Sequence, residues 1–317
     1  MLDIGATPFP CSVRSYADHL ADSATVAWAG GAPWRLESGV LMPLAMPHTL
    51  GPMDRREIRG AMRWTGAKMA LWNDAWDTAA GPWWWVCADR RDYDSSQFKK
   101  NMRHDLRLGL ANCAVRRLEL AELAEQGYPV YLAAFSRYGT TPSLRSREAF
   151  VAEVTKAAQY AGREMWGAFL GPRLVAFASC IVIDDAVAFS WAKADPEHLK
   201  SFPNHALYYE LTKHYLRDRG LRYVADGVRA LRHATQMQDF LEKLGYRKVY
   251  CPARVEMSPV LAAVLALRAH RWGPSLGLGV VARGLMEKLR LAAELAGIAS
   301  ACRALPAAPV DREGGGA

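Results

Sequence analysis

The stretch Phe202-Pro203-Asn204-His205-Ala206-Leu207, together with Tyr223-Val224-Ala225-Asp226-Gly227 further on, decides the fold of this chain. In the first segment an extended run gives way to a helix, because Leu207, Leu211 and Tyr215 recur at helical spacing. The second segment is a short apolar run that ends in Asp-Gly, a pattern typical of a buried strand followed by a turn. The two segments therefore predict a strand, a helix and a second strand in succession.

Three strands are predicted upstream of this junction. They are Trp166–Leu170, Arg173–Ile183 and Ala186–Lys193. Gly171-Pro172 and Asp184-Asp185 supply turn residues between them. Strands joined by such short turns form an antiparallel meander.

Another helix and a strand are predicted downstream. Apolar side chains fall at i, i+3, i+4 and i+7 from Met237 to Leu244, and Gly245 is placed to end that helix. Residues Tyr246–Met257 return to strand character. The predicted order is three antiparallel strands, helix, strand, helix and strand.

This order resembles the acyl-CoA N-acyltransferase (GNAT) superfamily and, within it, the FemAB-like acyltransferases. The residues that carry the resemblance are Asn204–Tyr209 opening a helix, Asp226-Gly227 after a strand, and Phe240–Arg247 closing a helix. The resemblance covers about Asn112 to Met257. It implies an α+β fold with a mixed, mostly antiparallel sheet flanked by helices.

The resemblance also suggests how the chain is divided. Residues 1–111 are expected to form an N-terminal subdomain, a degenerate GNAT-like half that ends in a basic helix at 95–110. Residues 112–258 would be the acyltransferase domain and 259–305 a C-terminal helical extension. Residues 306–317, which end in Gly-Gly-Gly-Ala, are predicted to be a disordered tail.

The composition narrows the class of protein. The chain has 317 residues, 51% of them hydrophobic, which is enough for about two domains. Its formal charge of +8 favours anionic partners such as nucleotide phosphates, anionic lipid headgroups or RNA. The six cysteines lie far apart without a C-x-x-C pair, so we expect neither a metal site nor disulfides. Without a signal peptide or an apolar membrane span, the expected location is cytoplasmic.

The predicted basic helix has two interpretations. Lys99, Arg103 and Arg107 step by four beside an apolar stripe that runs from Phe98 to Leu110. The simpler interpretation is a solvated polar face. The alternative is a surface that contacts the phosphates of an anionic acceptor or of RNA.

The residues after Met257 also have two interpretations. Val260–Leu267 and Gly277–Ala296 are apolar with interspersed basic side chains. These segments would either pack on the core as added helices or make peripheral contact with an anionic membrane through 259–296.

The resemblance implies a binding site for acyl-CoA as the donor co-substrate. In the family the pantetheine arm pairs with the strand before the central helix, and the pyrophosphate rests on the N-terminus of that helix. The residues at the matching positions are Trp191, Lys193, Lys200, Asn204, His205 and Ala206. The family's glycine-rich signature is replaced here by Lys200-Ser201-Phe202-Pro203-Asn204-His205-Ala206, which puts close approach of a pyrophosphate in doubt.

Acyl transfer to an amine needs a proton acceptor and a group that protonates the leaving thiolate. Asp226, at the end of its strand, is the first candidate base, and His233 is the second. The alternative for Asp226 is ordinary turn chemistry, and for His233 an exposed loop residue. Leu241 stands where the family often has its proton-donating tyrosine. Three other tyrosines are possible substitutes, namely Tyr208, Tyr209 and Tyr246.

Three functions follow from these features. The first is an acyl-CoA:amine N-acyltransferase that acts on a small-molecule or peptide amine. The second is a FemAB-like transferase that takes an aminoacyl group from tRNA, for which the basic helix would be a binding surface. The third is a GNAT-fold binding module without catalysis, suggested by the absent glycines and by Leu241.

Overall fold

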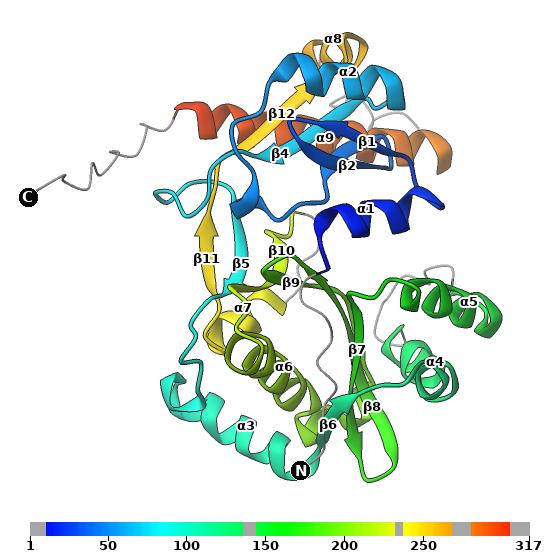
Figure 1. Cartoon of the computed structure of the whole chain (residues 1–317), viewed down its shortest axis with the longest axis vertical. Helices are drawn as coiled ribbons and strands as arrows, with labels where there is room; N and C mark the ends of the chain where they lie inside the picture. Colours follow the sequence, from blue (N-terminus) through cyan, green and yellow to red (C-terminus); the bar gives the residue numbers. More distant parts are fainter. Residues whose placement is uncertain (1–10, 136–143, 232–236, 268–279, 305–317) are drawn as a thin grey trace, which may run out of the picture. The chain divides into compact units, whose positions relative to one another are not determined.

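The computed structural model describes residues 11–135, 144–231, 237–267 and 280–304 (Figure 1). The chain divides into two compact units. Of the described residues, the first unit comprises those up to His19 and from Val86 to Lys248, and the second comprises those from Leu20 to Trp85 and from Val249 onward.

The first unit is built on a seven-stranded sheet with the order β11-β5-β10-β9-β8-β7-β6. The strands are β5 (Trp84–Ala88), β6 (Ala114–Arg117), β7 (Arg163–Leu170), β8 (Arg173–Ile183), β9 (Ala186–Ala194), β10 (Tyr223–Val228) and β11 (Arg247–Tyr250). Strands β6 to β9 form an antiparallel meander, and β10 is parallel to β9. The expected run of three antiparallel strands before the central helix is confirmed.

Helices cover both faces of this sheet (Figure 1). The helices of this unit are α1 (Val13–Ala21), α3 (Lys100–Asn112), α4 (Leu120–Phe135), α5 (Arg147–Ala158), α6 (Pro203–Lys213), which continues as a π-helical turn (His214–Asp218), and α7 (Met237–Lys243), with 3-10 turns at Ser95–Gln97 and Pro196–Ser201. Of these, α4 and α5 pack on one face of the sheet and α6 on the other. On β7, Met165 packs into the core beneath α4 and α5. Its neighbour Trp166 donates a hydrogen bond to the Tyr215 hydroxyl (3.0 Å) on the other face, because successive strand residues point to opposite sides.

The second unit has a five-stranded sheet with the order β1-β2-β3-β4-β12. The strands are β1 (Val26–Ala29), β2 (Ala32–Glu37), β3 (Val40–Pro43), β4 (Met69–Asn73) and β12 (Ala253–Met257), and the helices are α2 (Arg55–Thr65), α8 (Pro259–Ala266) and α9 (Val280–Ala304), with a 3-10 turn at Pro47–Thr49. Trp34, Leu41 and Ile58 are fully buried between α2 and the sheet. Among the helices described here, none combines the length and apolar character needed to cross a bilayer.

The observed division differs from the expected boundaries at 112 and 258. Strand β12 pairs antiparallel with β4, from Ala253 opposite Asn73 to Met257 opposite Met69, and this pairing joins the end of the chain to the early residues. The basic helix α3 packs against α6 and therefore belongs to the first unit.

The single strand expected at Tyr246–Met257 is two strands, β11 and β12, in different sheets. Pro252 lies between them, and a proline has no N–H to give to a strand ladder. The expected fold class, an α+β fold of mostly antiparallel sheets flanked by helices, is confirmed.

Candidate functional site

The centre of the first unit is a place where two parallel strands separate. Strands β9 and β10 are paired only from Ala186 opposite Tyr223 to Ala188 opposite Ala225. Both strands continue, β9 to Ala194 and β10 to Val228. Asp226 is therefore the first residue of β10 beyond the pairing.

Beyond Ala188, β9 has a strand partner on one side only. Its pairing with β8 continues to Ala194, so the backbone edge that faced β10 is left without a strand partner among the described strands. An unpaired edge of this kind can accept an extended ligand that carries amide groups.

A β-bulge at Ser190 redirects the side chains of β9. Consecutive residues of β8, Ser179 and Cys180, face Trp191 and Phe189 respectively, so Ser190 is the extra residue. Its hydroxyl lies 3.0 Å from the Ser179 hydroxyl, and Arg163 donates to it (2.6 Å). Because of the bulge, Phe189 and Trp191 lie on opposite faces of the sheet.

The two aromatic residues beside the bulge have different surroundings. The centre of the Phe189 ring lies 5.0 Å from the centre of the Tyr208 ring on α6. The Trp191 ring lies 5.0 Å from that of Phe177 and 5.9 Å from that of Phe150, within the core beneath α4 and α5. Trp191, expected at the donor site, therefore has a packing role on the side away from α6.

Lys193 lies on the same side as Trp191. Its ammonium group is 4.7 Å from the centre of the Phe135 ring. Burial lowers the pKa of the Lys193 ammonium. The structure therefore does not bring Trp191 and Lys193 together with the candidates on α6.

Asp226 is a partly buried carboxyl where the strands separate. Burial raises its pKa from 3.8 to about 6, and a hydrogen bond from the Gln238 side chain acts in the opposite direction. The carboxyl therefore changes charge close to neutral pH, as a general base requires.

The buried Tyr208 of α6 lies close enough to Asp226 to be affected by its charge. The Tyr208 ring lies 6.0 Å from that of Phe240 on α7. Burial, with a smaller contribution from the charge of Asp226, raises the pKa of Tyr208 well above its usual value. Tyr208 therefore keeps its proton at any physiological pH.

The other two tyrosine candidates have structural contacts. The Tyr246 hydroxyl lies 2.7 Å from that of Thr212 in the core, and burial raises the pKa of Tyr246 well above its usual value. The Tyr209 ring packs 5.7 Å from that of Tyr93. Leu241 is fully buried and contributes to the core.

His205, in the first turn of α6, packs against two aromatic rings. Its ring is 4.9 Å from that of Phe240 and 5.1 Å from that of Phe202. Burial lowers the pKa of His205, so the imidazole is neutral at pH 7, and its buried Nδ1 has no hydrogen-bond partner in the part of the chain described. Sequence reasoning found His205 and Asp226 but not Phe240, whose apolar helical spacing predicts only core packing.

The first turn of α6 offers few free amide groups. Phe202, with φ of 58° and ψ of 39°, places its carbonyl oxygen to accept from His205 N (3.1 Å) and Ala206 N (3.3 Å). Pro203 has no N–H. Within the described residues, only the Asn204 N–H of this turn lacks a hydrogen-bond acceptor.

Helix α3 packs directly on this turn. A Cβ atom added at Gly109 would lie 2.6 Å from the Phe202 carbonyl oxygen and 3.3 Å from Ala206 N. Ala206 itself is fully buried. Lys200, at the end of the preceding 3-10 turn, is exposed. His233, the second candidate base, falls outside the described residues.

The exposed face of α3 is hollowed and basic. Lys100, Arg103, His104 and Arg107 line a groove of about 500 Å³. Arg103 donates to the Phe98 carbonyl (3.1 Å), and no acidic side chain in the described chain forms an ion pair with these four. The groove therefore keeps its positive charge.

One group of side chains in the described chain has the composition of a metal site. Ligand atoms of Asp195, Glu197 and His198 lie within 4.8 Å of one another. Asp195 already accepts hydrogen bonds from Glu197 N (3.0 Å) and from Arg173 (3.2 Å). The bond from Glu197 N caps the 3-10 turn that begins at Pro196, and Arg173 balances the charge of Asp195, so the cluster is explained without a metal ion.

Comparisons with known proteins support the fold but no narrower relationship. No protein-family model matches the sequence, and no curated protein matches it. Among solved structures, FemX is similar with a TM-score of 0.54 and 9% identity over 79% of this chain and 92% of FemX. The C-terminal domain of a proposed lysylphosphatidylglycerol synthetase from Agrobacterium fabrum has a TM-score of 0.51, with 11% identity over 81% and 94% of the two chains. L-PGS from Bacillus licheniformis has a TM-score of 0.50, with 11% identity over 81% and 91%.

These likenesses confirm the expected fold. The chain has the GNAT-like architecture that the resemblance to FemAB-like proteins predicted, and it matches most of the length of each of these structures. At about one residue in ten identical, the likeness shows the fold alone.

Proposed function

We propose that this chain is an N-acyltransferase that transfers an acyl group to an amine where β9 and β10 separate. The observation that carries the proposal is Asp226, the first residue of β10 beyond the pairing, whose pKa burial raises to about 6. At pH 7 most of this carboxyl is ionised and able to accept a proton, and no cation among the described residues lowers its pKa and so weakens it as a base.

The reaction assigns a role to each group. The amine nitrogen attacks the acyl carbonyl carbon while Asp226 takes a proton from the nitrogen. The bond between the acyl carbon and its carrier then breaks, and the carrier leaves with a proton. Tyr208, which is buried beside Asp226 and is protonated before the reaction, is the proposed donor of that proton, and the proton that Asp226 took from the amine then returns to Tyr208. The products are an amide and the free carrier.

Acyl-CoA is the first candidate for the donor. The open edge of β9 after Ala188 suits the amide groups of a pantetheine arm. Asn204 N–H and the exposed Lys200 are the groups available for its phosphates. The rest of the first turn of α6 is engaged by Phe202 and packed against Gly109, so phosphate binding would depend on these two groups.

An aminoacyl-tRNA is the second candidate for the donor. The basic groove on α3 favours it, because Lys100, Arg103 and Arg107 lie exposed along one helix without acidic partners in the described residues. The Agrobacterium fabrum neighbour is named for making an aminoacyl lipid, which agrees with an aminoacyl donor.

One panel of ligands tests both donors. We would follow the thermal unfolding of the protein with acetyl-CoA, longer acyl-CoAs, free CoA and aminoacyl-tRNA, since a ligand of the native state raises the midpoint. A shift with an acyl-CoA that Lys200→Ala removes supports the first donor. A salt-sensitive shift with aminoacyl-tRNA that Lys100→Ala/Arg107→Ala removes supports the second. No shift with any of them would contradict both.

Turnover tests the role of Asp226. With a donor identified, Asp226→Asn is expected to reduce kcat by about 100-fold or more while the donor still binds. Asp18→Asn, which removes an exposed carboxyl on α1, is the matched control. A fully active Asp226→Asn variant would refute this assignment.

A further inference from the structure

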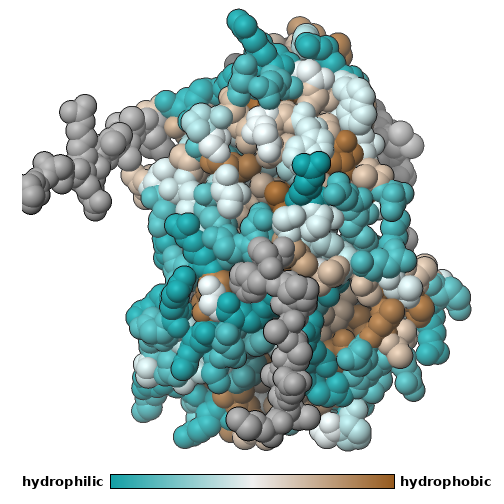
Figure 2. All heavy atoms as spheres, in the orientation of Figure 1, coloured by the Kyte–Doolittle hydropathy of each residue, from teal (hydrophilic) through white to brown (hydrophobic). Residues whose placement is uncertain are grey.

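Helix α8 of the second unit is apolar on every side and poorly covered. Its eight residues, Pro259–Ala266, include no buried side chain. Val260 is 74% exposed, and Leu267, directly after the helix, is 72% exposed. Figure 2 shows hydrophobic atoms at the surface where Figure 1 places α8. An apolar helix in this condition indicates a surface that contacts something other than water.

Helix α9, which follows α8 in the chain, has buried side chains, unlike α8. On α9, Leu295, Ala299 and Cys302 are buried, and the Cys302 sulfur accepts a hydrogen bond from Ala253 N (3.4 Å) on β12. Helix α9 therefore packs on the sheet, as expected if the residues after Met257 form helices added to the core. Packing of this kind does not explain α8.

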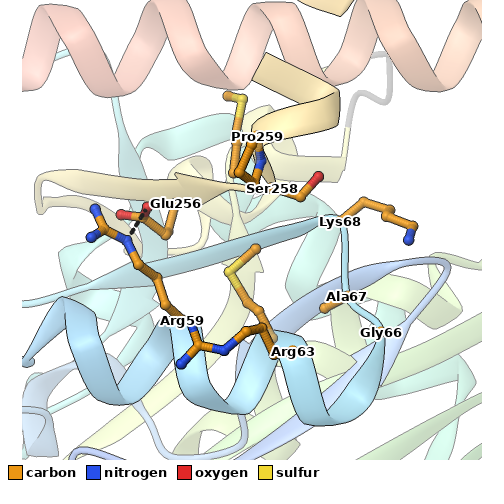
Figure 3. Close-up of a pocket in the computed structure, with 10 residues that line it drawn as sticks. Arg59, Arg63, Gly66, Ala67, Lys68, Glu256, Ser258 and Pro259 are labelled. Carbon is orange, nitrogen blue, oxygen red and sulfur yellow. Dashed lines mark hydrogen bonds and ion pairs between the residues drawn. The ribbon is translucent and has the colours of Figure 1, made fainter. Parts of the chain in front are cut away.

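A basic pocket adjoins the start of α8 (Figure 3). It has a volume of about 560 Å³, and Pro259 of α8 lines it together with Met62, Met257, Arg63 and Lys68. Thioether and ring carbons thus lie beside two cationic side chains. This combination suits a ligand with an anionic group and apolar chains.

The pocket carries a net positive charge. Its acidic residue, Glu256, accepts from Arg59 (2.7 Å) and pairs with Arg55 (3.4 Å), so its charge is already compensated. Arg63 and Lys68 form no ion pair with any residue in the described ranges. Two cations therefore remain for an external anion.

We propose that the second unit binds the surface of a bilayer that contains anionic phospholipids. Helix α8 lies in the interface with Val260 and Leu267 among the acyl chains, and a headgroup phosphate enters the pocket between Arg63 and Lys68. Apolar side chains and basic side chains on one surface are what an anionic interface selects, because hydrophobic insertion and headgroup attraction act together. A protein partner would account for the apolar helix but would not need the two uncompensated cations beside it.

Vesicle flotation tests this proposal with the full chain. We expect the protein to float with vesicles of phosphatidylcholine and phosphatidylglycerol, and not with pure phosphatidylcholine. Arg63→Gln/Lys68→Gln should weaken binding about 30-fold at low salt, since each basic residue near an anionic surface contributes roughly fivefold. Val260→Ser/Leu267→Ser should weaken it without changing its salt dependence.

Two controls keep the outcome interpretable. Arg147→Gln/Lys156→Gln removes the same charge from exposed positions on α5 and should leave binding unchanged. Inorganic phosphate, compared with chloride at equal ionic strength, should not displace the protein from vesicles. All variants should show the thermal midpoint of the parent protein.

Several results would overturn the proposal. They are equal binding to neutral and anionic vesicles, equal losses in the pocket variant and the α5 control, and no binding to any vesicle. Selective displacement by inorganic phosphate would identify the pocket as a small-anion site and not as part of a bilayer-binding surface. None of these results depends on whether the first unit transfers acyl groups.

Discussion

Replacing Asp226 by asparagine should stabilise the protein near neutral pH, although it removes the proposed base. Burial raises the pKa of this carboxyl from 3.8 to about 6 in the folded chain. The folded state therefore holds the proton to a higher pH than the unfolded state does. The contribution of Asp226 to the free energy of unfolding is therefore fully present below about pH 4 and is lost as the pH rises from about 4 to about 6.

The magnitude follows from the size of the pKa change. A difference of about two pKa units corresponds to about 3 kcal/mol at a pH above both values. Because Asp226 is partly exposed, water screens some of this penalty, and we expect a gain of about 2 to 3 kcal/mol for Asp226→Asn at about pH 8. Asparagine has nearly the same shape and can still accept the hydrogen bond from Gln238.

The gain should shrink as the pH falls. At about pH 4.5 the folded carboxyl is already protonated, so the advantage of asparagine should be only about 1 kcal/mol. Urea unfolding of both proteins at about pH 8 and about pH 4.5 measures the difference directly. Asp18→Asn, on the exposed face of α1, should show no such pH-dependent gain.

An equal effect of Asp226→Asn at the two pH values would refute this reasoning. It would mean that the carboxyl is not desolvated in the folded state, and the main support for its role as a base would be lost. Destabilisation at pH 8 would refute it as well, because it would show that the charged carboxylate makes favourable contacts.

Four further substitutions test the packing of the fold. Gly109→Ala should destabilise the protein by about 1 to 3 kcal/mol, because the added Cβ would lie 2.6 Å from a backbone oxygen. Gly60→Ala on α2 should stabilise it by about 0.5 to 1 kcal/mol, because its Cβ would have no atom within 4 Å. Urea unfolding of the two variants would compare these effects. Glu164→Ala should cost about 3 to 5 kcal/mol by the same measurement, because it leaves the guanidinium of Arg219, 2.6 Å away, without its buried partner. Tyr246→Phe, which removes a buried hydroxyl contact, should cost about 1 kcal/mol and no more, and a much larger loss would show that the hydroxyl has another role.

Much of the first unit was predictable from local patterns. Turn residues such as Gly171-Pro172 separate the strands of the meander, and the apolar spacing of Leu207 and Leu211 identifies α6, because both signals arise from residues close in sequence. Asp226 was found in the same way, as a polar residue directly after the apolar run Tyr223–Ala225, although β10 continues to Val228.

The surroundings of the site were not predictable in this way. The bulge at Ser190 places Trp191 beneath α4 and α5, whereas strict alternation would have placed it on the same side as Phe189. The contact of His205 with Phe240 joins residues 35 positions apart. No local pattern distinguishes such a contact from ordinary core packing.

The sequence by itself determined the meander strands, helix α6 and strand β10 in their order, the mixed fold class and the place of Asp226 directly after an apolar run. These features depend on periodicity and turn chemistry, which act within a few residues. Tertiary structure alone decided that β12 joins β4, that the amides of the first turn of α6 are mostly engaged beneath α3, and that the Asp226 carboxyl is partly buried. The physical reason is that strand pairing, close packing and desolvation depend on residues distant in the chain, and become defined only when the whole unit folds.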